Sequence, residues 1–324
     1  MRHGRTLRRA IAAIALLLAA GTGGAQEAYP NRPLRFIVPF PPGGGPSIVA
    51  RLIGDKLRDR FGQPVIVENR PGAGANIGAE AVFRAPPDGY TLLVTPPGPL
   101  VINKSLYPKL AYDPDQFVPV SVLAMSPTLL IANSNQGIHS VEQLIAAAKA
   151  APGRLNYASP GSGTTGHLAS EMFNVMAGVK ILHIPYKGLG PALTDLIGGQ
   201  VGAMFMEIGG ALPHVRAGKV TVLAIGSPKR SPILPDVPAL TEVLPGLVIL
   251  PWFGMVAPPQ TPPAIIARLA SATAEAMRQP DVIERLQQLS LDPVGGTPDE
   301  MSAFMRRERE FWARLVRMTG ASVE

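Results

Sequence analysis

The segment FIVPFPPGGGPSIVARL, residues Phe36–Leu52, decides the fold, because it runs an apolar strand into three consecutive glycines and then into a helical pattern. A glycine-rich turn between a strand and a helix exposes backbone N–H groups, and the start of a helix favours negative charge. The segment therefore predicts an α/β fold with an anion-binding loop, and it leaves the identity of the anion open.

Spacing argues against a nucleotide as that anion. Counted from Gly43, the dinucleotide fingerprint and the P-loop both require a glycine where the chain has Ile48. In the second glycine-rich segment, Gly72, Gly74 and Gly78 are spaced one residue too widely for the fingerprint. Nucleotide binding is therefore disfavoured at both loops.

The first 25 residues are predicted to be a signal peptide. Four arginines open the chain, an apolar run from Ala10 to Ala20 follows, and small residues precede Gln26. The run is too short to span a bilayer comfortably, which makes a retained membrane anchor the less favoured alternative. The mature protein is therefore expected to start at or near Gln26 and to be periplasmic.

The absence of cysteine and the distribution of charge limit the class of protein further. The sequence has no cysteine, so disulfides and a lipid-modified N-terminal cysteine are both excluded. The formal net charge is +7, but four positive and no negative charges fall in the predicted signal, which leaves +3. The remaining Lys and Arg are scattered or mixed with acids, which favours solvated helix faces over a nucleic-acid-binding track. We expect a monomer that does not bind nucleic acid.

Apolar runs alternate with helical patterns along the mature chain. From Leu34 to Thr95 this alternation predicts a parallel sheet with helices on both faces, and a second such set starts within Phe117–Asn133. Trp252–Pro258 is predicted to be a buried strand, and two helices are predicted to finish the chain. We expect two doubly wound lobes joined by two hinge strands, with signal peptide 1–25, first lobe 26–125 and 251–324, and second lobe 126–250.

Catalytic motifs are thin. The sequence contains no G-x-S-x-G, H-E-x-x-H or S-x-x-K motif. His139, His167, His183 and His214 are scattered without metal-ligand spacing. We therefore expect no metal and no cofactor.

A second loop, within Tyr157–Glu171, repeats the order strand, glycine-rich loop, helix. It interleaves hydroxyl side chains with glycines, a combination that suits carboxylate oxygens. Two alternatives stay open at this point: a secreted serine hydrolase with Ser162 as nucleophile and His167 as base, and a loop that only caps its own helix.

Several segments together resemble the Bug/TctC family, the periplasmic receptors of tripartite tricarboxylate transporters. The segments are VPFPPGGGPSIVARL, GQPVIVENRPGAGANIGAEAV, PPDGYTLLV, SPGSGTTGHLASEMF, HIPYKGLGPALTDLIGGQV and RSPILPDVPALTE, which occur in that order along the mature chain. The resemblance implies a type II periplasmic binding protein fold that closes on a small carboxylate without catalysis. It also implies delivery of that carboxylate to membrane subunits of a transporter.

The same resemblance assigns ligand-binding residues to both lobes. In the first lobe they are Phe40, Pro41, Pro42, Gly43, Gly44, Gly45, Ser47, Thr95 and Pro96. In the second lobe they are Ser159, Gly161, Ser162, Gly163, Thr164, His167 and Glu207. Tyr186 and Lys187 are secondary candidates, because their segment could serve only to shape the cleft.

Two departures from the family pattern bear on the ligand. Ser47 stands where the family usually has aspartate, and Met206, followed by Glu207, stands where an acidic residue is common. A neutral residue at position 47 favours a ligand without positive charge, either a dicarboxylate or an aromatic acid. Whether Met206 or Glu207 faces the cleft is left open, and a receptor that feeds a signalling partner stays an alternative.

Overall fold

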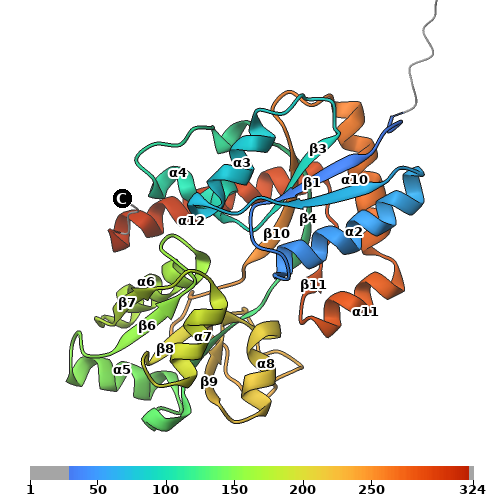
Figure 1. Cartoon of the computed structure of the whole chain (residues 1–324). Helices are drawn as coiled ribbons and strands as arrows, with labels where there is room; N and C mark the ends of the chain where they lie inside the picture. The colour runs from blue at the N-terminus through green and yellow to red at the C-terminus, as the bar shows by residue number, and fades with distance from the viewer. Residues whose placement is uncertain (1–28, 321–324) are drawn as a thin grey trace, which may run out of the picture. The chain divides into compact units, whose positions relative to one another are not determined.

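The computed structural model describes residues 29–320, in which two β-sheets each carry helices on both faces (Figure 1). The predicted signal peptide and its cleavage point at Gln26 lie outside the described residues. The first sheet has the strand order β11-β4-β10-β3-β1-β2, and the second has the order β7-β6-β8-β5-β9. The strands are β1 (Leu34–Val38), β2 (Val65–Asn69), β3 (Thr91–Thr95), β4 (Val118–Met125), β5 (Thr128–Asn133), β6 (Asn156–Ser159), β7 (Leu182–Pro185), β8 (Ala203–Glu207), β9 (Val220–Ile225), β10 (Trp252–Ala257) and β11 (Asp292–Pro293).

Helices alternate with the strands along most of the described chain. The α-helices are α2 (Gly45–Phe61), α3 (Asn76–Phe83), α4 (Asn103–Leu106), α5 (Val141–Ala150), α6 (Thr165–Ala177), α7 (Leu189–Ile197), α8 (Ile208–Arg216), α9 (Leu240–Val243), α10 (Pro263–Met277), α11 (Pro280–Gln288) and α12 (Pro298–Thr319). Shorter helical turns are η1 (Ala73–Ala75), η2 (Gly98–Ile102), η3 (Pro114–Gln116) and η4 (Ser134–Gln136). Within residues 29–320, none of the helices has both the length and the apolarity needed to cross a bilayer.

The expectation of parallel sheets holds only in part. β1 pairs in parallel with β2 and β3, and β6 pairs in parallel with β7 and β8. However, β10 runs antiparallel to β3 and β4, and β5 runs antiparallel to β8 and β9. The sheets are mixed because β5 and β10 are the strands by which the chain enters a new sheet, and neither arrives through a strand–helix–strand crossover.

The second set of elements, expected to start within Phe117–Asn133, starts at β5. β4 pairs in the first sheet and ends at Met125, the last residue of the expected first part of the first lobe, and only Ser126 and Pro127 separate it from β5. One detail of the predicted order is wrong. The chain ends in three helices and not in two, because Pro280 starts α11 directly after α10. A short strand, β11, then pairs with β4 before α12 begins.

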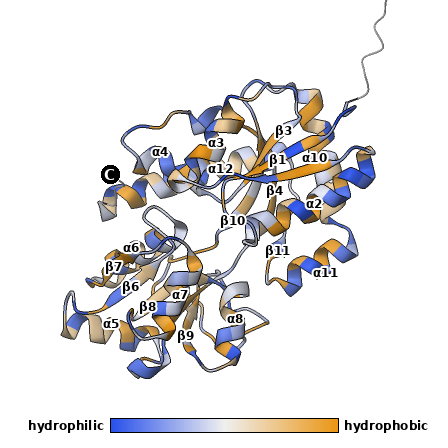
Figure 2. Cartoon of the chain, viewed as in Figure 1, coloured by the Kyte–Doolittle hydropathy of each residue, from blue (hydrophilic) through white to orange (hydrophobic). Residues whose placement is uncertain are grey.

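Apolar side chains from both faces of each sheet form the cores, and Figure 2 shows orange strands between helices of mixed colour. In the first sheet, one face packs against α3, η2 and α12 and the other against α2 and α10. In the second sheet, α5, α6 and α9 cover one face, and α7 and α8 cover the other. Burial at both faces is what makes the strands read as continuous apolar runs.

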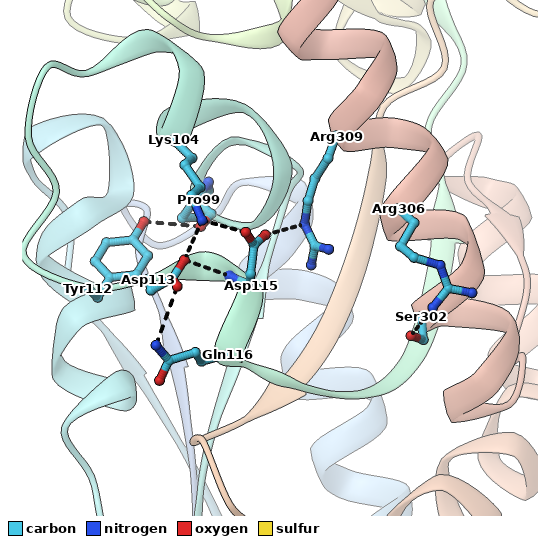
Figure 3. A network of polar contacts seen from close by, with 9 residues as sticks. All are labelled: Pro99, Lys104, Tyr112, Asp113, Asp115, Gln116, Ser302, Arg306 and Arg309. Carbon is cyan, nitrogen blue, oxygen red and sulfur yellow. Dashed lines mark hydrogen bonds and ion pairs between the residues drawn. The ribbon is translucent and has the colours of Figure 1, made fainter.

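Helix α12 is fixed to the first sheet by buried and by surface contacts. The Glu308 carboxylate accepts hydrogen bonds at 3.0 Å from the indole N–H groups of Trp252 and Trp312. At the surface, Arg309 pairs with Asp115 at 2.9 Å, and Lys104 joins Asp115 to Asp113 (Figure 3). Leu168 of α6 lies in the same core as α12, so α6 contacts the cores of both sheets.

Candidate functional site

The first glycine loop joins β1 to α2 and is open to solvent. Pro41–Gly44 are exposed, and Gly43 has a φ of +90°, a value that favours glycine. Within the described residues, the backbone N–H groups of Gly43, Gly44 and Gly45 donate to no acceptor. Because these groups lie at the N-terminus of a 17-residue helix that has no side-chain cap, the loop offers an anion a set of free donors.

Ser47 and Asn69 support the first glycine loop through hydrogen bonds. Asn69 Nδ2 donates to the Phe40 carbonyl at 2.8 Å and to Ser47 Oγ at 3.2 Å, and Arg51 donates to Asn69 Oδ1 at 3.4 Å. Ser47 is only 1% exposed. The Ser47 hydroxyl therefore acts on the loop through Asn69, a residue that the sequence did not single out.

The loop after β3 lies at the same edge of the first sheet. Ile37 pairs with Leu93 in parallel register, so the residues that follow β1 and β3 are neighbours. Thr95 is fully buried, and its hydroxyl donates to the Pro96 carbonyl at 3.1 Å. Pro96 is partly exposed, so the ring of Pro96, more than the side chain of Thr95, is presented at this edge.

The second glycine loop joins β6 to α6 and is partly closed on itself. Thr164 caps α6 by accepting from the His167 N–H at 3.4 Å, and the Thr164 hydroxyl donates to the Gly161 carbonyl at 2.7 Å. The buried Gly163 N–H donates to His167 Nδ1 at 3.0 Å. Ser162 is exposed, and its side chain makes no hydrogen bond within the described residues. Helix capping is thus one role of the loop, and the Ser162 hydroxyl is left available to a ligand.

Two stacked imidazoles support the second loop. The rings of His167 and His183 lie 4.0 Å apart, and Tyr157 stacks on His183 at 5.0 Å. His183 Nε2 lies 2.6 Å from Ser159 Oγ, within hydrogen-bond distance. Burial lowers the pKa of both imidazoles to about 4, and His167 adds to the lowering at His183. Both rings are therefore neutral at pH 7 and serve to position the loop.

This geometry does not support a serine hydrolase. The catalytic reading requires a hydrogen bond from Ser162 to His167, and none joins these side chains within the described residues. His167 Nδ1 is instead engaged by the Gly163 N–H, and His183 is engaged by Ser159. The expected nucleophile and base are five residues apart across a helix start and have separate structural partners.

Met206 packs in the core of the second sheet, whereas the side chain of Glu207 does not. Met206 is 5% exposed and packs with Met204 in the core beneath α7 and α8. Alternation along β8 places Glu207 on the opposite face with Phe205. Glu207 is half-buried, its carboxyl makes no hydrogen bond or ion pair within the described residues, and burial raises the pKa of that carboxyl. Its contact with a ligand stays a prediction.

The edges that carry the two glycine loops are joined by a two-residue link. β4 and β3 both run antiparallel to β10, so Met125 lies at the edge where β1 and β3 end. Ser126 and Pro127 lead directly to Thr128, which pairs with Glu207 at the edge where β6 and β8 end. The returning chain crosses beside this link, because the Ser126 N–H donates to the Pro251 carbonyl at 2.7 Å.

The secondary candidates, Tyr186 and Lys187, differ in their surroundings. Two residues that support the loops, Asn69 and His183, were not predicted as site residues. The Tyr186 hydroxyl donates to Asp195 at 2.7 Å, whereas Lys187 is exposed. The sequence did not predict the support that His183 gives to Ser159, nor the role of Asn69 behind the first loop. The signal for Asn69 was its place at the end of β2, beside the first glycine loop.

Solved structures define the class of protein. A Rhodopseudomonas palustris protein, Rpa4515, solved with adipate, superposes with a TM-score of 0.84 at 34% identity, covering 91% of this chain and 99% of that one. MatC (Rpa3494) from the same organism, solved with malate, has a TM-score of 0.81 at 35% identity, covering 89% and 100%. The fold is that of a type II periplasmic binding protein.

Sequence comparisons define the family. The family model described as "Tripartite tricarboxylate transporter family receptor" (TctC) matches residues 49–321. Protein BugT of Bordetella pertussis is 40% identical over 324 residues, covering 98% of this chain and 99% of BugT. The chain belongs to the TctC family of periplasmic solute receptors, which are binding proteins and not enzymes. The resemblance drawn from the sequence is thus confirmed.

Proposed function

We propose that this receptor binds a dicarboxylate between the two glycine loops, Phe40–Gly45 and Ser159–His167, and delivers it to the membrane subunits of a tripartite tricarboxylate transporter. The main support for the proposal is the two-residue link Ser126–Pro127. This link joins the edge of the first sheet that bears the first loop to the edge of the second sheet that bears the second loop. Adipate and malate, which occupy the two related structures, are both dicarboxylates.

The chemistry of the loops favours two anionic groups over one. Each loop precedes a helix of 13 or more residues, so each presents a helix N-terminus to a carboxylate. Neither loop contains Lys or Arg, so backbone N–H groups, the Ser162 hydroxyl and bridging water would satisfy the carboxylate oxygens. An aromatic monocarboxylate, the other expected class, would leave one of the two loops without an anion.

Closure would follow from contacts made to both loops. A ligand held by one loop alone has no preference for the open or the closed form, whereas a ligand that bridges both loops stabilises the closed form. The two crossing segments at Ser126–Pro127 and near Pro251 would absorb the rotation as hinges. The proposed lobes, 26–125 with 251–324 and 126–250, would then be the moving parts, and the closed form would be what the transporter recognises.

Titration calorimetry with a panel of small acids tests the proposal. The panel contains adipate, succinate, malate, benzoate and zwitterionic aspartate, and at least one dicarboxylate is expected to bind near micromolar Kd, about −8 kcal/mol. Ser162→Ala removes a free hydroxyl and should weaken binding about tenfold, which corresponds to about 1.4 kcal/mol.

Ser105→Ala is the matched control, because Ser105 is another exposed serine, placed on α4 away from both loops. It should bind like the wild type. Tight binding of aspartate, which carries an ammonium group, with no binding of adipate, succinate or malate would contradict the proposal, and so would an unchanged affinity in Ser162→Ala.

A further inference from the structure

Thr128 carries a buried hydroxyl that lacks a partner. The residue is 3% exposed, and Thr128 Oγ1 has no hydrogen-bond partner within the described residues. Leaving a buried hydroxyl unpaired costs about 1–3 kcal/mol, so such a group is rarely retained without a use. Its place in the fold indicates what that use is.

Thr128 and Glu207 lie side by side at one edge of the second sheet. They are directly opposite each other in the antiparallel β5–β8 register, so their side chains point to the same face. On that face the Glu207 carboxyl also has no hydrogen bond or ion pair within the described residues. Two neighbouring polar side chains, Thr128 and Glu207, therefore both lack a hydrogen-bond partner within the described residues.

The Thr128–Glu207 pair lies at the edge of the sheet next to the second glycine loop. Tyr157 pairs with Ala203 and Ala158 pairs with Met204, so β6 and β8 run in parallel and end at the same edge of the sheet, where the second loop begins. A Cβ added to Gly166 would lie 3.3 Å from the Phe205 carbonyl, which shows how closely the start of α6 approaches the end of β8. Thr128 and Glu207 therefore lie at the edge of the sheet that carries the second loop, close to the start of α6.

We propose that Thr128 and Glu207 form a subsite for a ligand hydroxyl on the carbon next to the carboxylate, so that the receptor prefers a hydroxylated dicarboxylate. The inference rests on the proposed dicarboxylate receptor and adds the substituent that the site selects.

The chemistry of the pair selects a hydroxyl over other substituents. A threonine hydroxyl and a ligand hydroxyl each donate and accept, and the Glu207 carboxyl offers oxygen acceptors beside them. Burial raises the pKa of Glu207, which disfavours the ionised form that a ligand ammonium would need. A methylene group at the same position would leave both side chains unpaired, and sites of that kind reject the analogue that lacks the hydroxyl.

Malate and succinate test the subsite, because they differ only in one hydroxyl group. Calorimetry of the wild type should give a malate affinity at least about tenfold above that of succinate. Thr128→Val and Glu207→Leu should each reduce this ratio about tenfold, mainly through weaker malate binding. Glu207→Gln keeps an oxygen acceptor and should keep the ratio within about threefold.

Thr273→Val is the matched control. Thr273 on α10 is fully buried, and its hydroxyl also lacks a partner within the described residues, but it belongs to the first sheet's helices and to neither loop. Thr273→Val should leave both affinities unchanged. Equal affinities of the wild type for the two acids, or an unchanged ratio in Thr128→Val, would overturn the subsite and leave the dicarboxylate receptor standing. Binding of neither malate nor succinate would overturn the subsite, and the receptor proposal would be contradicted as well if adipate also failed to bind.

Discussion

His167 links the stability of the second glycine loop to pH. Its neutral ring accepts the buried Gly163 N–H at Nδ1 and stacks on His183, and it is only 6% exposed. Protonation at Nδ1 would replace this acceptor with a donor and place a charge in a buried stack. Acidification should therefore destabilise the folded protein through this residue, and His167→Gln should remove that sensitivity.

The magnitude follows from the two pKa values of the imidazole. The pKa of His167 is about 4 in the folded state and about 6.5 in the unfolded chain, so between these values the unfolded state binds the extra proton. The contribution of His167 to the free energy of unfolding is thus fully present above pH 6.5 and is lost as the pH decreases toward 4. At about 1.4 kcal/mol per pH unit, His167 alone accounts for a loss of about 3 kcal/mol.

Urea unfolding between pH 7.5 and 4.5 measures this loss. Circular dichroism is the appropriate signal because it reports on both sheets, whereas Trp252 and Trp312 both lie in the core of the first sheet. With His167 and His183 both titrating, the wild-type slope should reach about 2.7 kcal/mol per pH unit, and His167→Gln should lower it by about half.

His139→Gln is the control for the substitution itself, because the His139 side chain is exposed; this variant should follow the wild-type curve. Parallel curves for the wild type and His167→Gln would refute the assigned role of the imidazole.

Three further substitutions separate the fold of the first loop from its binding role. A Cβ at position 45 would lie 2.8 Å from the ring of the buried Phe253, so Gly45→Ala should destabilise the protein by about 1–3 kcal/mol, as measured by thermal unfolding. Gly44→Ala meets no atom closer than 3.8 Å and should change stability by less than about 0.5 kcal/mol; equal effects of the two substitutions would contradict the packing. Ser47→Asp places a negative charge in the first turn of α2 beside Asn69, and calorimetry should show weaker binding of a dicarboxylate; unchanged affinity would remove Ser47 from the determinants of ligand charge.

Most of the secondary structure was predictable because the local signals agree with the fold. The run Leu34–Val38 ends in Pro39, glycines follow, and Pro46 lies in the first turn of α2, so both elements are bounded by their own residues. Strand direction was harder to predict. The change of lobe was expected between residues 125 and 126, but a two-residue connection between apolar strands is typical of a hairpin, so the local pattern at Ser126–Pro127 does not reveal the direction of the strands in the two sheets.

The site was predictable at the level of loops and less so at the level of side chains. Glycines and hydroxyls after a strand mark a helix N-terminus, and the resemblance to the family supplied the residues. The support from His183 depends on the parallel register of β6 and β7, which places it beside Tyr157 and within reach of Ser159. Register is a tertiary property, so a single imidazole in the strand at Leu182–Pro185 carried no such signal.

A crystal structure of the receptor with a bound dicarboxylate tests the central claim most directly. The account predicts one acid that bridges the two loops, with one carboxylate at the N–H groups of Gly43–Gly45 and the other at Ser162 and the start of α6. Density for the acid at only one of the loops, or at a place remote from both, would contradict it.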